Sequence, residues 1–190
     1  MPRRVAVLCA LLLCFACSEP PQKEIDHAQG AIDAARAAGA ERYAPAEFTA
    51  ATEALSQAHE AVAQRDYRTA LSRALTASER AQAAAKQAAD GKARARSEAE
   101  GALNAATTAL QQLRTSLKTA EAQKLRARQL APARKAILRV DATLQEARTH
   151  LAAGRYLEAS AALKPVIPQV SEQIRALTDS LAKAKAGRRR

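Results

Sequence analysis

Apolar residues recur at spacings of three and four along most of this chain, and this periodicity constrains the fold more than any other feature. Side chains at these spacings lie on one face of an α-helix. The same stretches are rich in alanine, and only 3% of the residues are aromatic, so helix propensity agrees with the pattern. We therefore predict an all-α fold, either an antiparallel helical bundle or a short solenoid. Four stripes carry this prediction: Phe48, Ala51, Leu55, Ala58 and Val62; Leu103, Ala106, Leu110, Leu113 and Leu117; Ile137, Val140, Leu144, Ala147 and Leu151; and Val170, Ile174, Leu177 and Leu181.

The stripes also indicate an internal duplication. Positions between Phe48 and Ala70 map without a gap onto positions between Ile137 and Ala159, at a constant offset of 89 residues. Shorter upstream matches have offsets of 87 and 85, as two-residue insertions in loops would produce. They pair Ala44, Pro45 and Ala46 with Ala131, Pro132 and Ala133, and Ile25, Ala28 and Ile32 with Leu110, Leu113 and Leu117. We interpret the chain as two three-helix units, residues 22–100 and 101–182.

Prolines and glycines predict where the helices begin and end. Proline is tolerated in a first helical turn, because its missing N–H would have no partner there, so Pro45 and Pro132 are predicted helix starts. Residues before a proline disfavour helical geometry, and Pro165 and Pro168 therefore predict a break at 164–167. The segment between Gly91 and Gly101 fits either a loop between the units or part of one long helix.

Two short segments have the pattern of tight helical hairpins. Residues 64–66 and 153–155 each follow the end of a stripe, and each is followed by a tyrosine and then by an alanine three positions later. These residues are Tyr67 and Ala70 in the first unit, and Tyr156 and Ala159 in the second. The pattern resembles the corner of a tetratricopeptide helix pair. We predict that each tyrosine ring packs in its corner while its hydroxyl reaches a polar partner; ligand stacking is the alternative.

The wider stretch from Gly39 to Leu71 resembles an uncharacterised alanine-rich helical family of bacterial envelope proteins, the domain of unknown function 4398. The resemblance covers about residues 22–90 well and 105–180 more loosely. It implies a helical bundle or a short solenoid. It transfers no catalytic residue.

The amino terminus has the layout of a signal peptide. A basic start at residues 1–4 precedes an apolar core at 5–16, which is shorter than the roughly 20 residues that span a bilayer. A cut before Cys17 resembles the bacterial lipoprotein pattern, in which that cysteine carries the lipid, although Cys14 stands where leucine is usual. Ordinary secretion and an uncleaved anchor are the alternatives.

Residues 17–21 would then link the lipid anchor to the first helical unit. Serine after the modified cysteine resembles the class sorted to the outer membrane, which implies an outer-membrane protein facing the periplasm. The three cysteines all lie within the first seventeen residues, so the helical part can form no disulfide.

Catalytic and metal-binding motifs are absent from the sequence. The three histidines, His27, His59 and His150, do not stand at metal-ligand spacing from one another. Glu98 and Glu100 could in principle form an acid–base pair, but a solvated helix is a poor environment for one. We therefore expect a protein without enzymatic activity, metal or cofactor.

Positive charge is concentrated in the second half of the chain. Residues 17–101 contain 11 basic and 13 acidic residues, whereas residues 102–190 contain 17 basic and 6 acidic ones, and a basic tail occupies 183–190. A cluster opposed by a single acid, Glu121, consists of Arg114, Lys118, Lys124, Arg126, Arg128, Arg134, Lys135 and Arg139. Such a cluster attracts anionic polymers and membrane surfaces. Nucleic acid is not expected, because the cluster lacks aromatic residues for base stacking.

These features predict a lipid-anchored helical scaffold that contacts an anionic envelope component, such as the cell wall, an anionic lipid or an acidic protein. The alternative is an accessory subunit that docks a partner helix on the apolar stripes within an envelope transport or enzyme complex. A third interpretation involves no partner: the positive charge then reflects only an arginine-rich composition on a solvated surface. The oligomeric state does not follow from the pattern.

Overall fold

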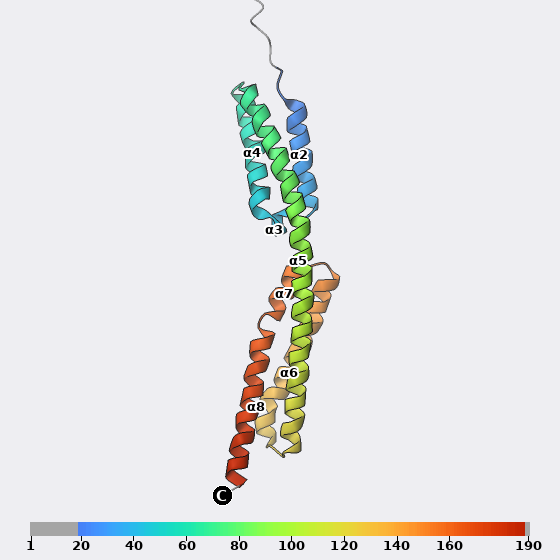
Figure 1. Cartoon of the computed structure of the whole chain (residues 1–190), viewed down its shortest axis with the longest axis vertical. Helices are drawn as coiled ribbons and strands as arrows, with labels where there is room; N and C mark the ends of the chain where they lie inside the picture. Colours follow the sequence, from blue (N-terminus) through green and yellow to red (C-terminus); the bar gives the residue numbers. More distant parts are fainter. Residues whose placement is uncertain (1–18, 189–190) are drawn as a thin grey trace, which may run out of the picture. The chain divides into compact units, whose positions relative to one another are not determined.

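The computed structural model describes residues 19–188, and these residues form helices and no strand (Figure 1). The predicted all-α fold is confirmed. The predicted signal peptide and Cys17 lie outside the described residues, as do Arg189 and Arg190. The helices are α2 (Gln22–Ala37), α3 (Ala40–Tyr43), α4 (Pro45–Ala63), α5 (Tyr67–Ala122), α6 (Ala127–Ala152), α7 (Tyr156–Leu163) and α8 (Val166–Arg188).

The chain separates into two compact units, Met1–Gly91 and Lys92–Arg190, and α5 contributes to both of them. This 56-residue helix includes Gly91 and Gly101, so the segment between these glycines is helical. The predicted unit boundary at 100/101 falls inside α5. The predicted basic tail is helical as far as Arg188. Among the described helices, none is long and apolar enough to cross a membrane.

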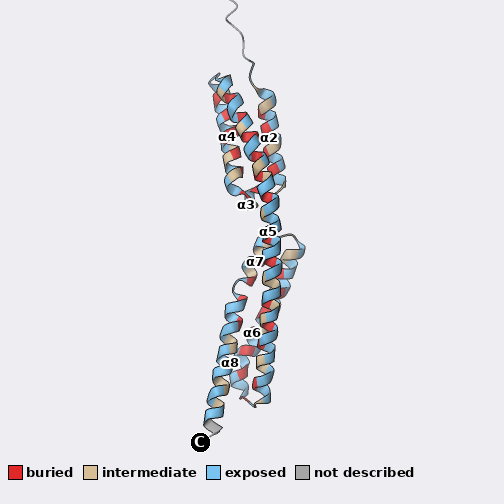
Figure 2. Cartoon of the chain, in the orientation of Figure 1, coloured by how far each residue is buried: buried red, intermediate tan, exposed pale blue. Residues whose placement is uncertain are grey.

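In the first unit, α2, α4 and the first half of α5 lie side by side (Figure 1). Buried residues line the facing sides of these helices (Figure 2). The large apolar side chains are Ile25 and Ile32 from α2 and Phe48 and Leu55 from α4. The apolar residues on the core face of α5 in this unit are all alanines: Ala70, Ala74, Ala77, Ala81, Ala84 and Ala88.

The alanine face of α5 determines how this unit packs. Interaxial distances between packed helices depend on the side chains at the contact, and a methyl group lets the neighbouring helices approach closely. Each alanine buries little area, so the unit depends on many small contacts. One polar group interrupts this face: the Ser78 hydroxyl is buried and shares a 3.1 Å hydrogen bond with Nδ1 of His27 on α2.

The second unit packs α6, α7 and α8 against the second half of α5. Its core side chains are larger, and the fully buried ones include Leu110, Leu113, Val140, Val166 and Val170. Several buried positions have a buried counterpart in the first unit at the offset of 89: Ala51 with Val140, Leu55 with Leu144, Ala58 with Ala147 and Ala70 with Ala159. A duplication predicts this burial pattern, but the duplication itself stays an interpretation of the sequence.

Three of the helix ends share one closing geometry. After α4, α5 and α6, a residue with positive φ is followed by a residue whose N–H bonds back five positions. In the first corner, Arg65 has a φ of 60° and the N–H of Asp66 donates to the carbonyl of Ala61 at 2.9 Å. This pairing is the Schellman motif. The positive-φ residues of the other two corners are Lys124 and Gly154.

The prediction for one of the two prolines is wrong. Pro45 is the first residue of α4, as predicted, but Pro132 lies inside α6, which begins at Ala127. Proline at position 132 removes one backbone hydrogen bond. The extra turn persists because Leu130 is buried in the core just after the corner. The predicted break at 164–167 is confirmed at its start, since α7 ends at Leu163 and α8 begins at Val166.

Candidate functional site

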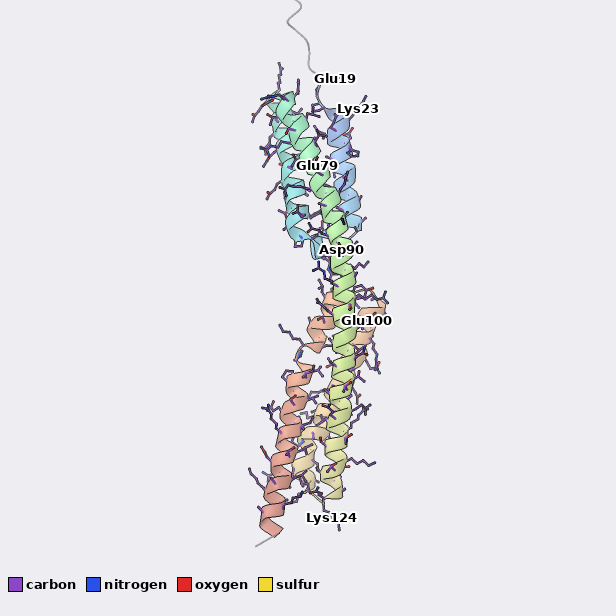
Figure 3. All side chains as sticks on the ribbon, viewed as in Figure 1. Glu19, Lys23, Glu79, Asp90, Glu100 and Lys124 are labelled. Atoms are coloured by element: carbon purple, nitrogen blue, oxygen red, sulfur yellow. The ribbon has the colours of Figure 1, made fainter. Side chains whose placement is uncertain are left out.

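The predicted basic cluster surrounds the corner between α5 and α6 in the second unit. Its members lie on the last three turns of α5, in the corner and on the first four turns of α6, and all eight are exposed. Lys124 occupies the positive-φ position of the corner (Figure 3). We call the surface formed by these eight residues the basic corner. The fold brings its members together because the Schellman turn reverses the chain within a few residues.

Two of the eight basic side chains are neutralised by acids on the neighbouring helix. Arg114 donates to both carboxylate oxygens of Asp141, at 2.8 and 2.7 Å. Arg134 binds Glu121 Oε1, at 2.7 Å through its terminal nitrogen. Arg114 and Glu121 are seven residues apart on α5, and Arg134 and Asp141 are seven residues apart on α6. Both pairs therefore agree with one antiparallel register between the two helices.

The expectation that Glu121 alone opposes the cluster is therefore wrong. Asp141 lies two residues after Arg139, the last member of the cluster. The antiparallel packing of α6 on α5 places it beside Arg114. The sequence pattern does not indicate this contact, because the partners are 27 residues apart in the chain. Aligning the two helices as an antiparallel pair in the correct register would have predicted it.

The remaining six members form no ion pair with any of residues 19–188. They are Lys118, Lys124, Arg126, Arg128, Lys135 and Arg139. On α6, residues 128, 135 and 139 are spaced by seven and four and so share one face. Unpaired positive groups in water attract polyanions over distances of the order of the Debye length, about 10 Å at 0.1 M salt. The arrangement can bind an extended anionic surface.

The two predicted corner tyrosines are half-buried. Tyr67 is the first residue of α5 and Tyr156 the first residue of α7, whereas Ala70 and Ala159 are fully buried one turn later. The predicted roles of these four residues stay predictions.

A hollow of about 390 Å³ lies in the second unit between α5, α7 and the start of α8. Its wall is largely apolar and includes Leu157 and Ile167, which are 42% and 45% exposed. Glu98 also lines the hollow, whereas Glu100 forms a 2.8 Å ion pair with Arg96. Hydrogen bonding to Glu100 raises the pKa of Arg96. The two carboxylates therefore have different surroundings.

The Ser78–His27 contact has the distance of a nucleophile–base pair, but it joins α2 to α5 in the helix interface. Ser78 is only 5% exposed, which leaves no room for a substrate carbonyl. Across residues 19–188, no group of three or more histidine, cysteine, aspartate or glutamate side chains is arranged to hold a metal ion.

Comparison with known families matches residues 23–99 to one described as a domain of unknown function, DUF4398. Residues 23–99 are therefore similar to members of this family. The match begins one residue into α2, includes α3 and α4, and ends within α5 at residue 99. It leaves the basic corner outside the family segment. Neither curated proteins nor solved structures gave a match.

Proposed function

We propose that this chain is a lipid-tethered helical binding protein of the bacterial envelope, whose basic corner contacts an anionic polymer such as the cell wall. The observation that carries the proposal is the set of six exposed, unpaired basic side chains around one helical corner. An anionic polymer would contact several of them at once. No enzymatic step is part of this function.

The proposed tether rests on the sequence. An apolar segment ends at Cys17, and the described helices begin at Gln22, which leaves a short linker between lipid and domain. A lipid on Cys17 would hold the chain at the outer membrane, facing the periplasm. Mass measurement of the mature amino terminus tests this step, and an unmodified terminus at another residue would overturn it.

Binding to isolated cell wall across a salt series tests the basic corner. The test variant replaces four residues of the basic corner by glutamine: Lys118, Lys124, Arg126 and Arg128. We expect it to bind more weakly than the parent at low salt, and we expect this difference to shrink as salt rises. A matched control changes four exposed basic residues of the first unit to glutamine, namely Lys23, Arg68, Arg73 and Lys86. Equal binding by the two variants would contradict the proposal, because net charge alone would then explain binding.

A second candidate function uses the apolar hollow. The exposed Leu157 and Ile167 favour a role as an accessory subunit that docks an amphipathic helix of another envelope protein. Crosslinking in cells separates the two functions. Recovery of one stoichiometric protein partner would support this second function if Leu157→Ser loses that partner and the basic-corner variant keeps it.

A further inference from the structure

Two leucines near the start of α5 are exposed on the same side of the helix. Leu71 is 38% and Leu75 50% exposed, and a spacing of four places them on one face. The alanine face of α5 provides the core contacts of this unit, so the leucines lie outside its packing.

The position of Leu71 relative to the beginning of the described chain gives this pair a context. Leu71 lines a hollow together with Glu19, Pro20, Pro21, Gln22, Lys23 and Glu24. Figure 3 labels Glu19 and Lys23 at this end of the first unit. Leu71 therefore belongs to the end of the unit at which the linker enters.

The length of the linker limits what can cover the leucines. Cys17 precedes Glu19 by two residues, a span of at most about 7 Å. Lipid attached to Cys17 would therefore bring Glu19, and with it the hollow that Leu71 lines, to the headgroup region. Leu75 follows one helical turn later, about 6 Å along the axis.

We propose that Leu71 and Leu75 are a membrane contact, inserting between the headgroups of the bilayer that holds the lipid on Cys17. This inference rests on the proposed tether and adds a second, protein-borne attachment. The charged residues of the hollow, Glu19, Lys23 and Glu24, are of mixed sign, so charge attraction to headgroups contributes little and the proposed contact depends on the two leucines. It is insensitive to salt, unlike binding through the basic corner.

The absence of tryptophan from the chain provides a clean probe. Leu71→Trp and Leu75→Trp each introduce a single fluorophore at an exposed site. The matched control is Ala89→Trp, since Ala89 is exposed on the same helix and lies 18 residues, or five full turns, beyond Leu71. That control fluorophore faces the same side of α5 but stands about 27 Å further along it.

The experiment uses the chain from Cys17 onward, which retains every described residue. Cys17 is its only cysteine, so a maleimide phospholipid can be coupled there and inserted into phosphatidylcholine vesicles with brominated acyl chains. The tether is then present whatever the cell attaches. Failure of the native lipidation, detected by mass, thus remains distinguishable from failure of the membrane contact.

We expect the emission of the Leu71→Trp and Leu75→Trp variants to shift to the blue on vesicles and to be quenched about twofold or more relative to Ala89→Trp, since interfacial groups enter about 5–10 Å into the headgroup boundary. The quenching should persist at high salt. Equal quenching in all three variants would overturn the proposal. A blue shift that is already complete without vesicles would also overturn it, because a second copy of the chain would then cover the leucines.

Discussion

Gly91 lets α5 pass against the backbone carbonyl of Tyr43: a Cβ at position 91 would stand 2.9 Å from that oxygen and 3.2 Å from the Tyr43 Cβ. Tyr43 ends α3, the short helix between α2 and α4. The glycine thus allows a close approach at the last residue of the first unit. Glycine is typical of loops, but Gly91 lies inside the helix α5. The residues from Gly91 to Gly101 therefore fit both a loop and a helix when only the sequence is considered.

Gly91→Ala should destabilise the first unit, even though alanine is the better helix former. The new methyl group meets a backbone oxygen, which cannot rotate away, and overpacking of this kind costs about 1–3 kcal/mol. Gly101→Ala is the control, because nothing lies within 4 Å of its Cβ position; there alanine should stabilise by up to about 1 kcal/mol. Urea unfolding measures both variants. A gain in stability at both positions would contradict the close approach.

Arg65→Gly should stabilise the first unit. Arg65 has a φ of 60°, a left-handed conformation that costs a residue with a side chain about 1–2 kcal/mol. Glycine would avoid that cost, offset by its greater entropy when unfolded. Gly154, with a φ of 70° in the α6–α7 corner, supplies the opposite test. Gly154→Ala should lower the thermal midpoint, and a rise would show that the corner does not require the left-handed conformation.

Acidification should weaken the start of α5 through Asp66. Its carboxylate accepts the Thr69 N–H at 3.0 Å, and hydrogen bonding from Thr69, first from the backbone and then from the side chain, lowers the pKa of Asp66. A carboxyl group with a lowered folded pKa contributes stability above its unfolded pKa, about 3.9, and loses it as pH falls through the folded value. Stability from this group should therefore decline below about pH 4.

Asp66→Asn isolates the pH effect, because asparagine also caps helices but does not titrate. We expect the thermal midpoint of the parent to fall towards that of the variant as pH decreases from 5 to about 2. Arg155→Asn is the control at the corresponding corner, where α7 begins without a side-chain cap. A constant difference between parent and Asp66→Asn across this range would contradict the prediction.

Removing the acids of the basic corner should strengthen binding to an anionic polymer. Glu121→Gln and Asp141→Asn free the side chains of Arg134 and Arg114, adding two unpaired positive groups. Exposed ion pairs contribute only about 0–1 kcal/mol each, so the helices should remain folded by circular dichroism. Cell-wall binding should rise and depend more steeply on salt. Weaker binding with an intact fold would mean that the pairs position the surface.

The sequence by itself determined the helices and most of their ends. Spacings of three and four specify an apolar face wherever the helix lies, and local residues such as Pro45 and Pro165 act within one turn. The basic cluster was equally readable, since its members crowd one stretch of chain. These properties depend on interactions between near neighbours.

Only the tertiary structure decided the features that depend on residues far apart in the chain. Pro132 lies within a helix because the burial of Leu130 outweighs one lost hydrogen bond. Arg114 is neutralised because antiparallel packing carries Asp141 to it. Leu71 adjoins the beginning of the described chain because α2 and α5 pack together. Sequence periodicity specifies which face of a helix is buried, but the register between two helices depends on how their side chains fit together in space.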